Sequence, residues 1–286
     1  MKIVIVPNPY RDKEYRYARQ VREILCAHGV QQQVALPFGD DTQFLLPEDL
    51  HALPLREALQ DADAIVCLGG DGTLLHIAKE ASEQDVPILG VNIGSLGFMA
   101  ELESGELQQL KKLVAGEYSV EERMMLDVSV EAEGKTVFSD RALNDVVITK
   151  GTVARIIQAD VFCDGAKVYS LCGDGVIVCT PTGSTGYSLS AGGPILDPTV
   201  RNILVTPICA HRPQTASMVL GADRTLTVQA ERCGRRNAFL SVDGGKAFRL
   251  NQFCAVRISA SSRVTKLIRL KNTPFFSTIS RKLYST

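Results

Sequence analysis

Apolar and polar residues alternate with two different periods along the chain, and the period changes near residue 118. In the first part, apolar runs alternate with segments whose apolar residues recur every three or four positions. Such runs are typical of strands buried on both faces, and the intervening spacing is typical of amphipathic helices. This pattern predicts a parallel sheet with helices on both faces, with strands over 2–7, 33–37, 62–70 and 86–92 and helices over 12–28, 73–82 and 104–117.

The second part alternates apolar and polar residues one by one between short turns, as in MLDVSVEAE, TLTVQAER and AVRISAS. This period is typical of an antiparallel, all-β domain. The tail carries Phe275, Phe276, Ile279 and Leu283 at helical spacing. A helix this short is not stable alone, so we expect its apolar face to dock. The predicted division is an α/β domain at 1–118, a β-domain at 119–272 and a tail helix at 273–286.

Composition narrows the class of protein. A length of 286 residues suggests about two domains, and 31 basic against 32 acidic residues argue against a dedicated nucleic-acid binder. The longest uncharged stretch, 175–196, is too rich in Gly, Ser and Thr to span a membrane. The eight cysteines form no Cys-x-x-Cys pair, which argues against a closed zinc site. With no signal-like start and no Asn-x-Ser/Thr sequence, we expect a cytoplasmic protein without nucleic-acid or membrane partners.

The sequence Gly69-Gly70-Asp71-Gly72-Thr73 joins a predicted strand to a predicted helix. This is where α/β sheets bind phosphate, on the free N–H groups of a helix N-terminus. A carboxylate there repels phosphate unless it has a specific role, such as accepting a proton from a hydroxyl or holding a metal ion. Alternatively, Asp71 only caps the helix. No Gly-Lys-Ser/Thr follows, so the loop is not a Walker A loop.

Two further segments carry candidate binding groups. After the strand ending at Cys179, a long run of Gly, Ser and Thr contains one aromatic residue, Tyr187. It is either a turn-rich loop or a site where a purine or pyridine ring stacks on Tyr187. Asn144 and Asp145 precede another strand. They form either a simple Asx turn or a pair that binds an adenine edge and ribose hydroxyls.

Together these motifs resemble the NAD kinase family. The resemblance rests on GGDGTLL (69–75), LND (143–145) and TPTGSTGYSLSAGGPILDP (180–198), supported by LGVNIGSLGFMAEL (89–102), TPICAH (206–211) and SVDG (241–244). GGDGT alone also occurs in diacylglycerol and sphingosine kinases, whereas the Thr-Pro-Thr-Gly-Ser-Thr segment is specific to NAD kinases. The resemblance covers nearly the whole chain.

The resemblance implies a Rossmann-like N-terminal domain, a β-sandwich-like C-terminal domain and a C-terminal helix that returns to the first domain. It implies transfer of a phosphoryl group from ATP or polyphosphate to the 2′-hydroxyl of the adenosine ribose of NAD, producing NADP. It also implies a divalent cation, Mg²⁺ or Mn²⁺, and a homodimer or homotetramer in which NAD lies between domains and contacts a neighbouring subunit.

By position in these motifs, Asp71 is the expected proton acceptor, and no residue is assigned as a metal ligand. The other expected ligand contacts are Gly69, Gly70, Gly72, Thr73, His76, Asn144, Asp145, Arg155, Asp174, Thr182, Thr185, Gly186, Tyr187, Ser188, Leu189, Ser190 and Cys209. A helix histidine and a solvated arginine are the alternatives for His76 and Arg155. Asp174 has no obvious cation beside it in sequence, so we expect it at the subunit contact.

The chain departs from the family pattern at several positions. Gly186 replaces the usual Ala, and Cys172, Ala210 and Gly245 also differ from the common residues. None of these departures touches the expected base. Two other functions remain open at this point: a lipid kinase that shares GGDGT, and a non-catalytic NAD or NADP sensor.

Overall fold

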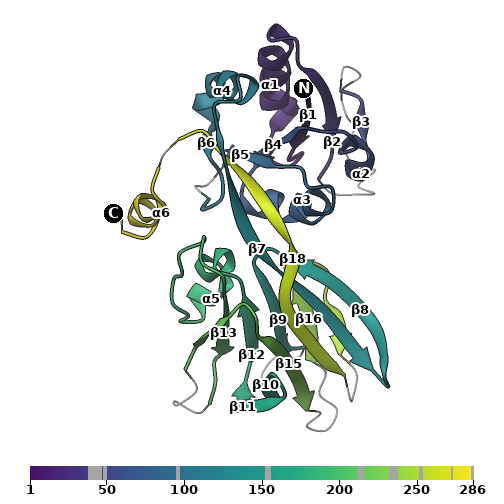
Figure 1. Ribbon diagram of the computed structural model, residues 1–286, viewed down its shortest axis with the longest axis vertical. Coiled ribbons are helices and arrows are strands. Elements are labelled where there is room, and N and C mark those ends of the chain that lie inside the picture. Colours follow the sequence, from purple (N-terminus) through teal and green to yellow (C-terminus); the bar gives the residue numbers. More distant parts are fainter. Residues whose placement is uncertain are drawn as a thin grey trace. The chain divides into compact units, whose positions relative to one another are not determined.

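The computed structural model describes residues 1–37, 47, 50–94, 97–151, 156–211, 216–231, 238–250, 254–271 and 273–284 (Figure 1). The chain divides into two compact units, one of Met1–Glu122 with Thr265–Thr286 and one of Arg123–Val264. The divisions differ from the sequence-based boundaries after residues 118 and 272. The reason is that β7 (Ser119–Ala132) and β18 (Ala255–Arg269) each run through a junction without a break that sequence could reveal.

The first unit is built on a parallel sheet with the strand order β18-β5-β4-β1-β2-β3, and β6 also pairs with β5. Its strands are β1 (Lys2–Pro7), β2 (Gln31–Ala35), β3 (Ala52–Leu53), β4 (Ala64–Gly69), β5 (Ile88–Asn92), β6 (Leu102–Glu103) and the end of β18. Its helices are η1 (Lys13–Tyr15), α1 (Arg16–Ala27), α2 (Leu55–Ala58), α3 (Asp71–Glu83), η2 (Ser104–Gln109) and α4 (Leu110–Val114).

The apolar runs of this unit are buried on both sides, as the sequence predicts. Ile3 and Ile5 of β1 pack in one cluster with Val21 of α1 and Leu110 of α4. Because successive strand residues point to opposite faces, Val4 and Val6 face the other side, where Figure 1 shows α3. The predicted α/β class is thus confirmed. The expected helix over 104–117 is instead split into η2 and α4.

The second unit is a sandwich of two sheets that enclose one apolar core. The first sheet contains β8 (Lys135–Ala142), β7, β18, β15 (Thr225–Glu231), β10 (Ile157–Cys163) and β11 (Ala166–Gly173). The second contains β14 (Met218–Gly221), β13 (Asn202–Ile208), β12 (Gly175–Cys179), β9 (Asp145–Lys150), β16 (Ala238–Val242) and β17 (Phe248–Leu250). Neighbours such as β9 and β12 run antiparallel, and the predicted β-sandwich class is confirmed.

The tail forms α6 (Phe275–Ile279) and η4 (Ser280–Tyr284), and it belongs to the first unit. The expected docking through an apolar face is not found among the described residues, because Phe276 is 65% exposed and Leu283 is 41% exposed. Contact is instead made by the Lys282 ammonium, 3.8 Å from the centre of the Phe98 ring. No helix among the described residues is long and apolar enough to cross a membrane.

Candidate active site

Asp71 is the first residue of α3 and directly follows the turn after β4. The helix cap is Gly70, whose carbonyl accepts the N–H groups of Thr73 and Leu74 at 3.0 and 3.2 Å. The capping interpretation of Asp71 is therefore wrong. Its carboxylate instead accepts the N–H of Phe98 at 2.7 Å and the N–H of Met99 at 3.1 Å. Two backbone amides from the segment after β5 hold this carboxylate in one orientation.

The glycines around Asp71 have two separate roles. At Gly97 an added Cβ would overlap an oxygen of the Asp71 carboxylate, so only glycine lets the Phe98–Met99 segment approach. At Gly70 and Gly72 an added Cβ would meet no atom within 4 Å. The N-terminus of α3 is therefore open on that side, where its free N–H groups can donate hydrogen bonds to a phosphate.

Three other side chains of this unit lie near the turn. Thr73 is buried, and its hydroxyl accepts a 2.7 Å bond from the Asn8 side chain, so its hydroxyl joins α3 to the chain segment that follows β1. His76 is exposed on α3. Burial lowers the pKa of Lys282, and the negative charge of Asp71 partly opposes that shift.

In the second unit, Asp243 fixes the Leu143–Asp145 turn. Its carboxylate accepts the N–H groups of Leu143, Asn144 and Asp145 at 2.7, 2.7 and 2.9 Å, and its own N–H donates to the Asp145 carbonyl at 2.9 Å. Asp243 has a φ of 47° and is followed by Gly244 at 70°, a left-handed turn that brings the carboxylate back over the backbone. Asp243 was not among the expected site residues, and the SVDG motif was the one sequence feature that included it.

The Asn144 side chain of this turn carries an unsatisfied polar atom. Asn144 Oδ1 is buried and has no hydrogen-bond partner among the described residues. Burial, and next the charge of Asp243, raise the pKa of Asp145 to about 7. A Cβ added at Gly186 would lie 3.7 Å from Asn144 Nδ2 and 3.9 Å from Asp145 Oδ2. These three residues therefore converge, and a ligand with a hydrogen-bond donor would satisfy Asn144 Oδ1.

The hydroxyl-rich segment begins where β12 ends and forms two short helices, η3 (Thr182–Thr185) and α5 (Tyr187–Ser190). It is tied to the Leu143–Asp145 turn at its start. Thr180 donates its N–H to the Asn144 carbonyl at 2.9 Å and its hydroxyl to the Leu143 carbonyl at 2.6 Å. A Cβ at Gly183 would overlap the Asn144 backbone. The Gly and Thr residues here are needed for close approach of two backbones.

Several hydroxyls of this segment serve the fold. The Thr182 hydroxyl accepts a 3.2 Å bond from buried Arg123, and the Ser188 and Thr206 hydroxyls bond each other at 2.8 Å in the interior. Thr185 donates to the Thr182 carbonyl at 3.2 Å. In contrast, Tyr187 is 46% exposed, Ser190 is exposed and Leu189 is half-buried. In α5, Tyr187, Leu189 and Ser190 therefore have surface available for a ligand, whereas Ser188 does not.

Asp174 and Cys209 lie at the opposite end of β12 and β13 from this turn. Asp174 is paired with Lys150, which is distant in sequence, with 2.6 Å between Nζ and Oδ1. Cys209 is exposed at the end of β13 with a φ of 46°. Arg155 lies outside the described residues. Within the described ranges, no three His, Cys, Asp or Glu side chains gather in a way that could hold a metal ion.

Comparison with known families accounts for both units. Residues 3–118 match the ATP-NAD kinase N-terminal domain, and residues 143–270 match the ATP-NAD kinase C-terminal domain. The chain belongs to the NAD kinase family. The NAD kinase of Citrifermentans bemidjiense is 39% identical over 289 residues, which are 99% of this chain and 98% of that protein. The NAD kinase of Caldanaerobacter subterraneus subsp. tengcongensis is 36% identical over 99% of this chain and 98% of its own.

Solved structures agree with this NAD kinase assignment. Yeast NADH kinase, solved with NADH, has the same fold, with a TM-score of 0.87 at 23% identity over 100% of this chain and 89% of that chain. The NAD kinase of Archaeoglobus fulgidus, solved with ATP, gives a TM-score of 0.74 at 26% identity over 98% and 97% of the two chains. The chain is therefore a kinase, and the lipid kinase alternative is not favoured.

Proposed function

We propose that this chain transfers the terminal phosphoryl group of ATP to the 2′-hydroxyl of the adenosine ribose of NAD, producing NADP, with Asp71 as the proton acceptor. One observation carries the assignment of the base. The Asp71 carboxylate stands at the open N-terminus of α3 and is oriented there by the Phe98 and Met99 amides. An ionised carboxylate has about four acceptor sites, and these two bonds leave the others for a hydroxyl.

The reaction joins the ribose oxygen to the γ-phosphorus while the bond from that phosphorus to the β-phosphate oxygen breaks. The 2′-hydroxyl proton passes to Asp71 as the new bond forms, and ADP leaves. Phosphoryl transfer depends chiefly on positioning and on neutralising charge on the transferred group. Asp71 thus serves first to orient the hydroxyl and then to take its proton.

The donor phosphates are held mainly by backbone. The free N–H groups at the start of α3, beside the open positions of Gly70 and Gly72, replace the lysine of a Walker A loop. Mg²⁺ or Mn²⁺ arrives bound to ATP as part of the substrate and neutralises its phosphate charge. Polyphosphate presents the same chemistry to these amides and is the second candidate donor.

The adenosine portion of NAD is bound by Asn144, Asp145 and the exposed part of α5. The unpaired Oδ1 of Asn144 accepts a hydrogen bond from the amino group of adenine, and the Asp145 carboxylate accepts hydrogen bonds from ribose hydroxyls. Tyr187 stacks on a base. The segments that hold Thr182 and Ser188 keep these groups in place, whereas Gly69 and Thr73 pack together in the turn that carries Asp71. We keep Thr185, Gly186, Ser190, Leu189, Asp174 and Cys209 as proposed contacts.

We further propose a cytoplasmic homo-oligomer that needs its neighbour for activity. The cysteines among the described residues are free thiols, which suits a reducing compartment. Because Asp174 already pairs with Lys150, a neighbouring subunit would meet this ion pair and not a lone carboxylate. Sedimentation at assay concentration tests the proposal, and a fully active monomer would overturn it.

Turnover is the direct test of function. The purified chain is incubated with NAD, ATP and Mg²⁺, and NADP is measured with an NADP-specific dehydrogenase, while ³¹P NMR locates the new phosphate. We expect a 2′-phosphate and no transfer to diacylglycerol. Tight NAD binding without any turnover would instead establish the sensor alternative, and polyphosphate in place of ATP identifies the donor.

A further inference from the structure

Arg269 lies at the end of β18 and is linked to Asp71 through a single residue, Met99. Its Nη1 donates to the Met99 carbonyl at 3.1 Å, and the N–H of Met99 donates to Asp71 Oδ1 at 3.1 Å. The Arg269 guanidinium therefore bonds the carbonyl of Met99, and the N–H of the same residue orients the Asp71 carboxylate.

The guanidinium is itself fixed. Nη2 lies 3.0 Å from Glu121 Oε1, and Nη1 lies 3.4 Å from Glu101 Oε2. The Arg269 side chain is 16% exposed and that of Glu101 is 6% exposed. Glu101 also accepts the N–H groups of Leu270 and Lys271 at 2.9 and 2.7 Å. A planar guanidinium can bond two carboxylates and a carbonyl together, whereas a lysine ammonium cannot keep this fork geometry.

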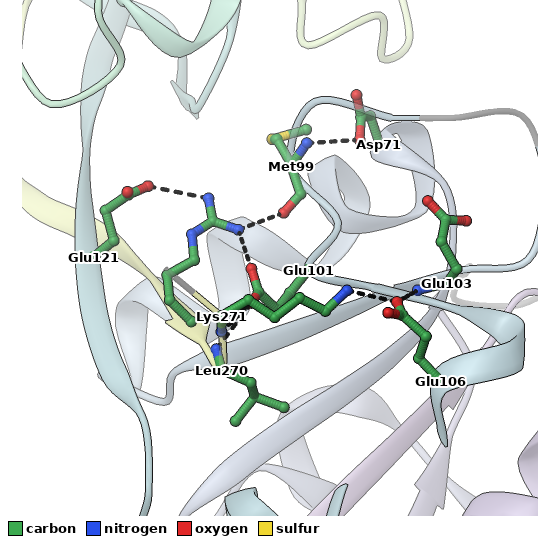
Figure 2. A network of polar contacts seen from close by, with 9 residues as sticks. Asp71, Met99, Glu101, Glu103, Glu106, Glu121, Leu270 and Lys271 are labelled. Carbon is green, nitrogen blue, oxygen red and sulfur yellow. Dashed lines mark hydrogen bonds and ion pairs between the residues drawn. The ribbon is translucent and has the colours of Figure 1, made fainter. Parts of the chain in front are cut away.

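The same chain segment has a second arm that does not reach Asp71. Lys271 Nζ donates to Glu106 Oε2 at 2.6 Å, and Glu106 Oε2 also accepts the Glu103 N–H at 2.9 Å (Figure 2). Burial opposes the charge of Glu106, but the Glu103 amide and Lys271 outweigh it and lower the pKa of this carboxyl. This arm fixes the start of η2 and provides a matched internal control.

We propose that Arg269 is a positioning residue for phosphoryl transfer, which acts by holding the Met99 backbone in the place where its N–H orients Asp71. This inference rests on the proposed role of Asp71 as the proton acceptor. Arg269 itself touches neither substrate. A misplacement of about 1 Å at a reacting group costs about 10²-fold in rate, so loss of this bond should lower kcat and spare substrate binding.

The experiment is a double-mutant cycle on the full chain. Arg269→Met, Asp71→Asn and the double variant are compared for kcat, for the KM of NAD and ATP, and for melting temperature. We expect Arg269→Met to lower kcat by about 10- to 100-fold with each KM within about threefold. If Arg269 acts through Asp71, the same substitution should lower kcat less than threefold when Asp71 is already Asn.

Matched variants separate positioning from stability. Lys271→Met breaks the ion pair to Glu106. Glu121→Gln breaks one ion pair of Arg269 but leaves the bond from Arg269 to Met99. Each of these two variants should keep kcat within twofold of the parent. Arg269→Lys keeps the charge beside both carboxylates and should recover only part of the activity. In ¹⁵N spectra, the Met99 amide should shift in Arg269→Lys and stay in place in Lys271→Met.

The outcomes distinguish this inference from the proposed function. Near-normal turnover of Asp71→Asn would remove the assigned base, and the inference with it. A second outcome is that Asp71→Asn loses most of its turnover, while Arg269→Met either does not lower kcat or lowers it equally in the parent and in Asp71→Asn. In that case Asp71 remains the assigned base, and the positioning role of Arg269 is overturned. If Arg269→Met does not fold, the same cycle is read with Arg269→Lys, for which a kcat within twofold of the parent overturns the proposal.

Discussion

Asp71 in the first unit and Asp243 in the second are both aspartates that accept backbone N–H groups from a neighbouring turn. Asp71 accepts two, from Phe98 and Met99, and is partly exposed beside open glycine positions. Asp243 accepts three and is half-buried at the base of the Leu143–Asp145 turn. The same bonding thus serves two purposes. In the first unit it orients a partly exposed carboxylate, and in the second it fixes the backbone of the Leu143–Asp145 turn.

In the second unit, burial disfavours the charged forms of Asp145 and Asp243. Burial, partly offset by the three N–H groups, raises the pKa of Asp243 to about 6, and burial with the Asp243 charge raises that of Asp145 to about 7. Two carboxyls held close together in the interior destabilise the fold when both ionise. The second unit retains this unfavourable pair, which suggests that the pair is kept for ligand binding and not for stability.

The largest expected effect is on turnover in Asp71→Asn. Asn cannot take the proton, and loss of a general base typically costs about 10²–10⁴ in rate, or roughly 2.7–5.4 kcal/mol. NAD affinity, measured by calorimetry, should change less than about tenfold. Because Asn has one acceptor oxygen, one of the two amides loses its partner, and the melting temperature is measured alongside.

Asp243→Asn is the matched control for this comparison. It removes the same charge from a buried turn in the other unit, so we expect weaker NAD binding and lower stability with kcat at saturating NAD largely kept. If Asp71→Asn turns over normally, or if the two variants behave alike, the contrast between the two aspartates is wrong.

The second prediction concerns the pH dependence of stability in Asp145→Asn. With a folded pKa of about 7 against about 3.9 unfolded, the folded state binds more protons between these values. The free energy of unfolding therefore falls as pH rises from about 4 to about 7. The neutral Asn should remove this fall and stabilise the second unit above pH 7, with an upper limit of about 4 kcal/mol, while NAD binding weakens.

Amide hydrogen exchange of β9 and β12 measures this stability within the second unit. The parent and Asp145→Asn should match near pH 4 and diverge toward pH 8. Asp160→Asn provides a control of opposite sign. Burial opposes the charge of Asp160, but Lys167 and Ser170 outweigh it and lower its pKa, so this variant should lose stability above pH 4. A parent protein whose protection does not change between pH 4 and pH 7 would contradict the buried-pair interpretation.

The comparison of the two regions also shows which features could be predicted from the sequence. Uniform apolar runs and strict alternation identified the α/β unit and the antiparallel all-β unit because these periods follow from which faces are buried. The sandwich arrangement of the second unit was implied only by the family resemblance. GGDGT and the hydroxyl-rich segment located the candidate site. The partners of Asp71 could not be predicted, because Phe98 and Met99 meet it only through the chain path after β5. The SVDG motif includes Asp243, but the backbone contacts of Asp243 and of Arg269 could not be predicted from the sequence.

The third prediction tests the orientation of Asp71 without changing it. In Gly97→Ala the added Cβ overlaps the Asp71 carboxylate, so either the carboxylate or the Phe98–Met99 segment must shift. We expect kcat to fall about 10²-fold with little change in NAD affinity. Gly105→Ala is the control, because a Cβ there meets no atom within 4 Å. Equal kinetics of the two variants would show that the amides do not orient the base.

The smallest expected effect is on NAD affinity in Tyr187→Ala. The ring is 46% exposed on α5, so little of the core depends on it. If it stacks on a base of NAD, its removal should weaken binding by about 1–3 kcal/mol. Tyr187→Phe keeps the stacking surface and should bind NAD as the parent does. If Tyr187 is only a packing residue, Tyr187→Ala instead lowers the melting temperature and leaves calorimetric affinity unchanged. Measuring both quantities on the same preparations decides whether the exposed face of α5, and not the buried hydroxyls beside it, is the binding surface of the second unit.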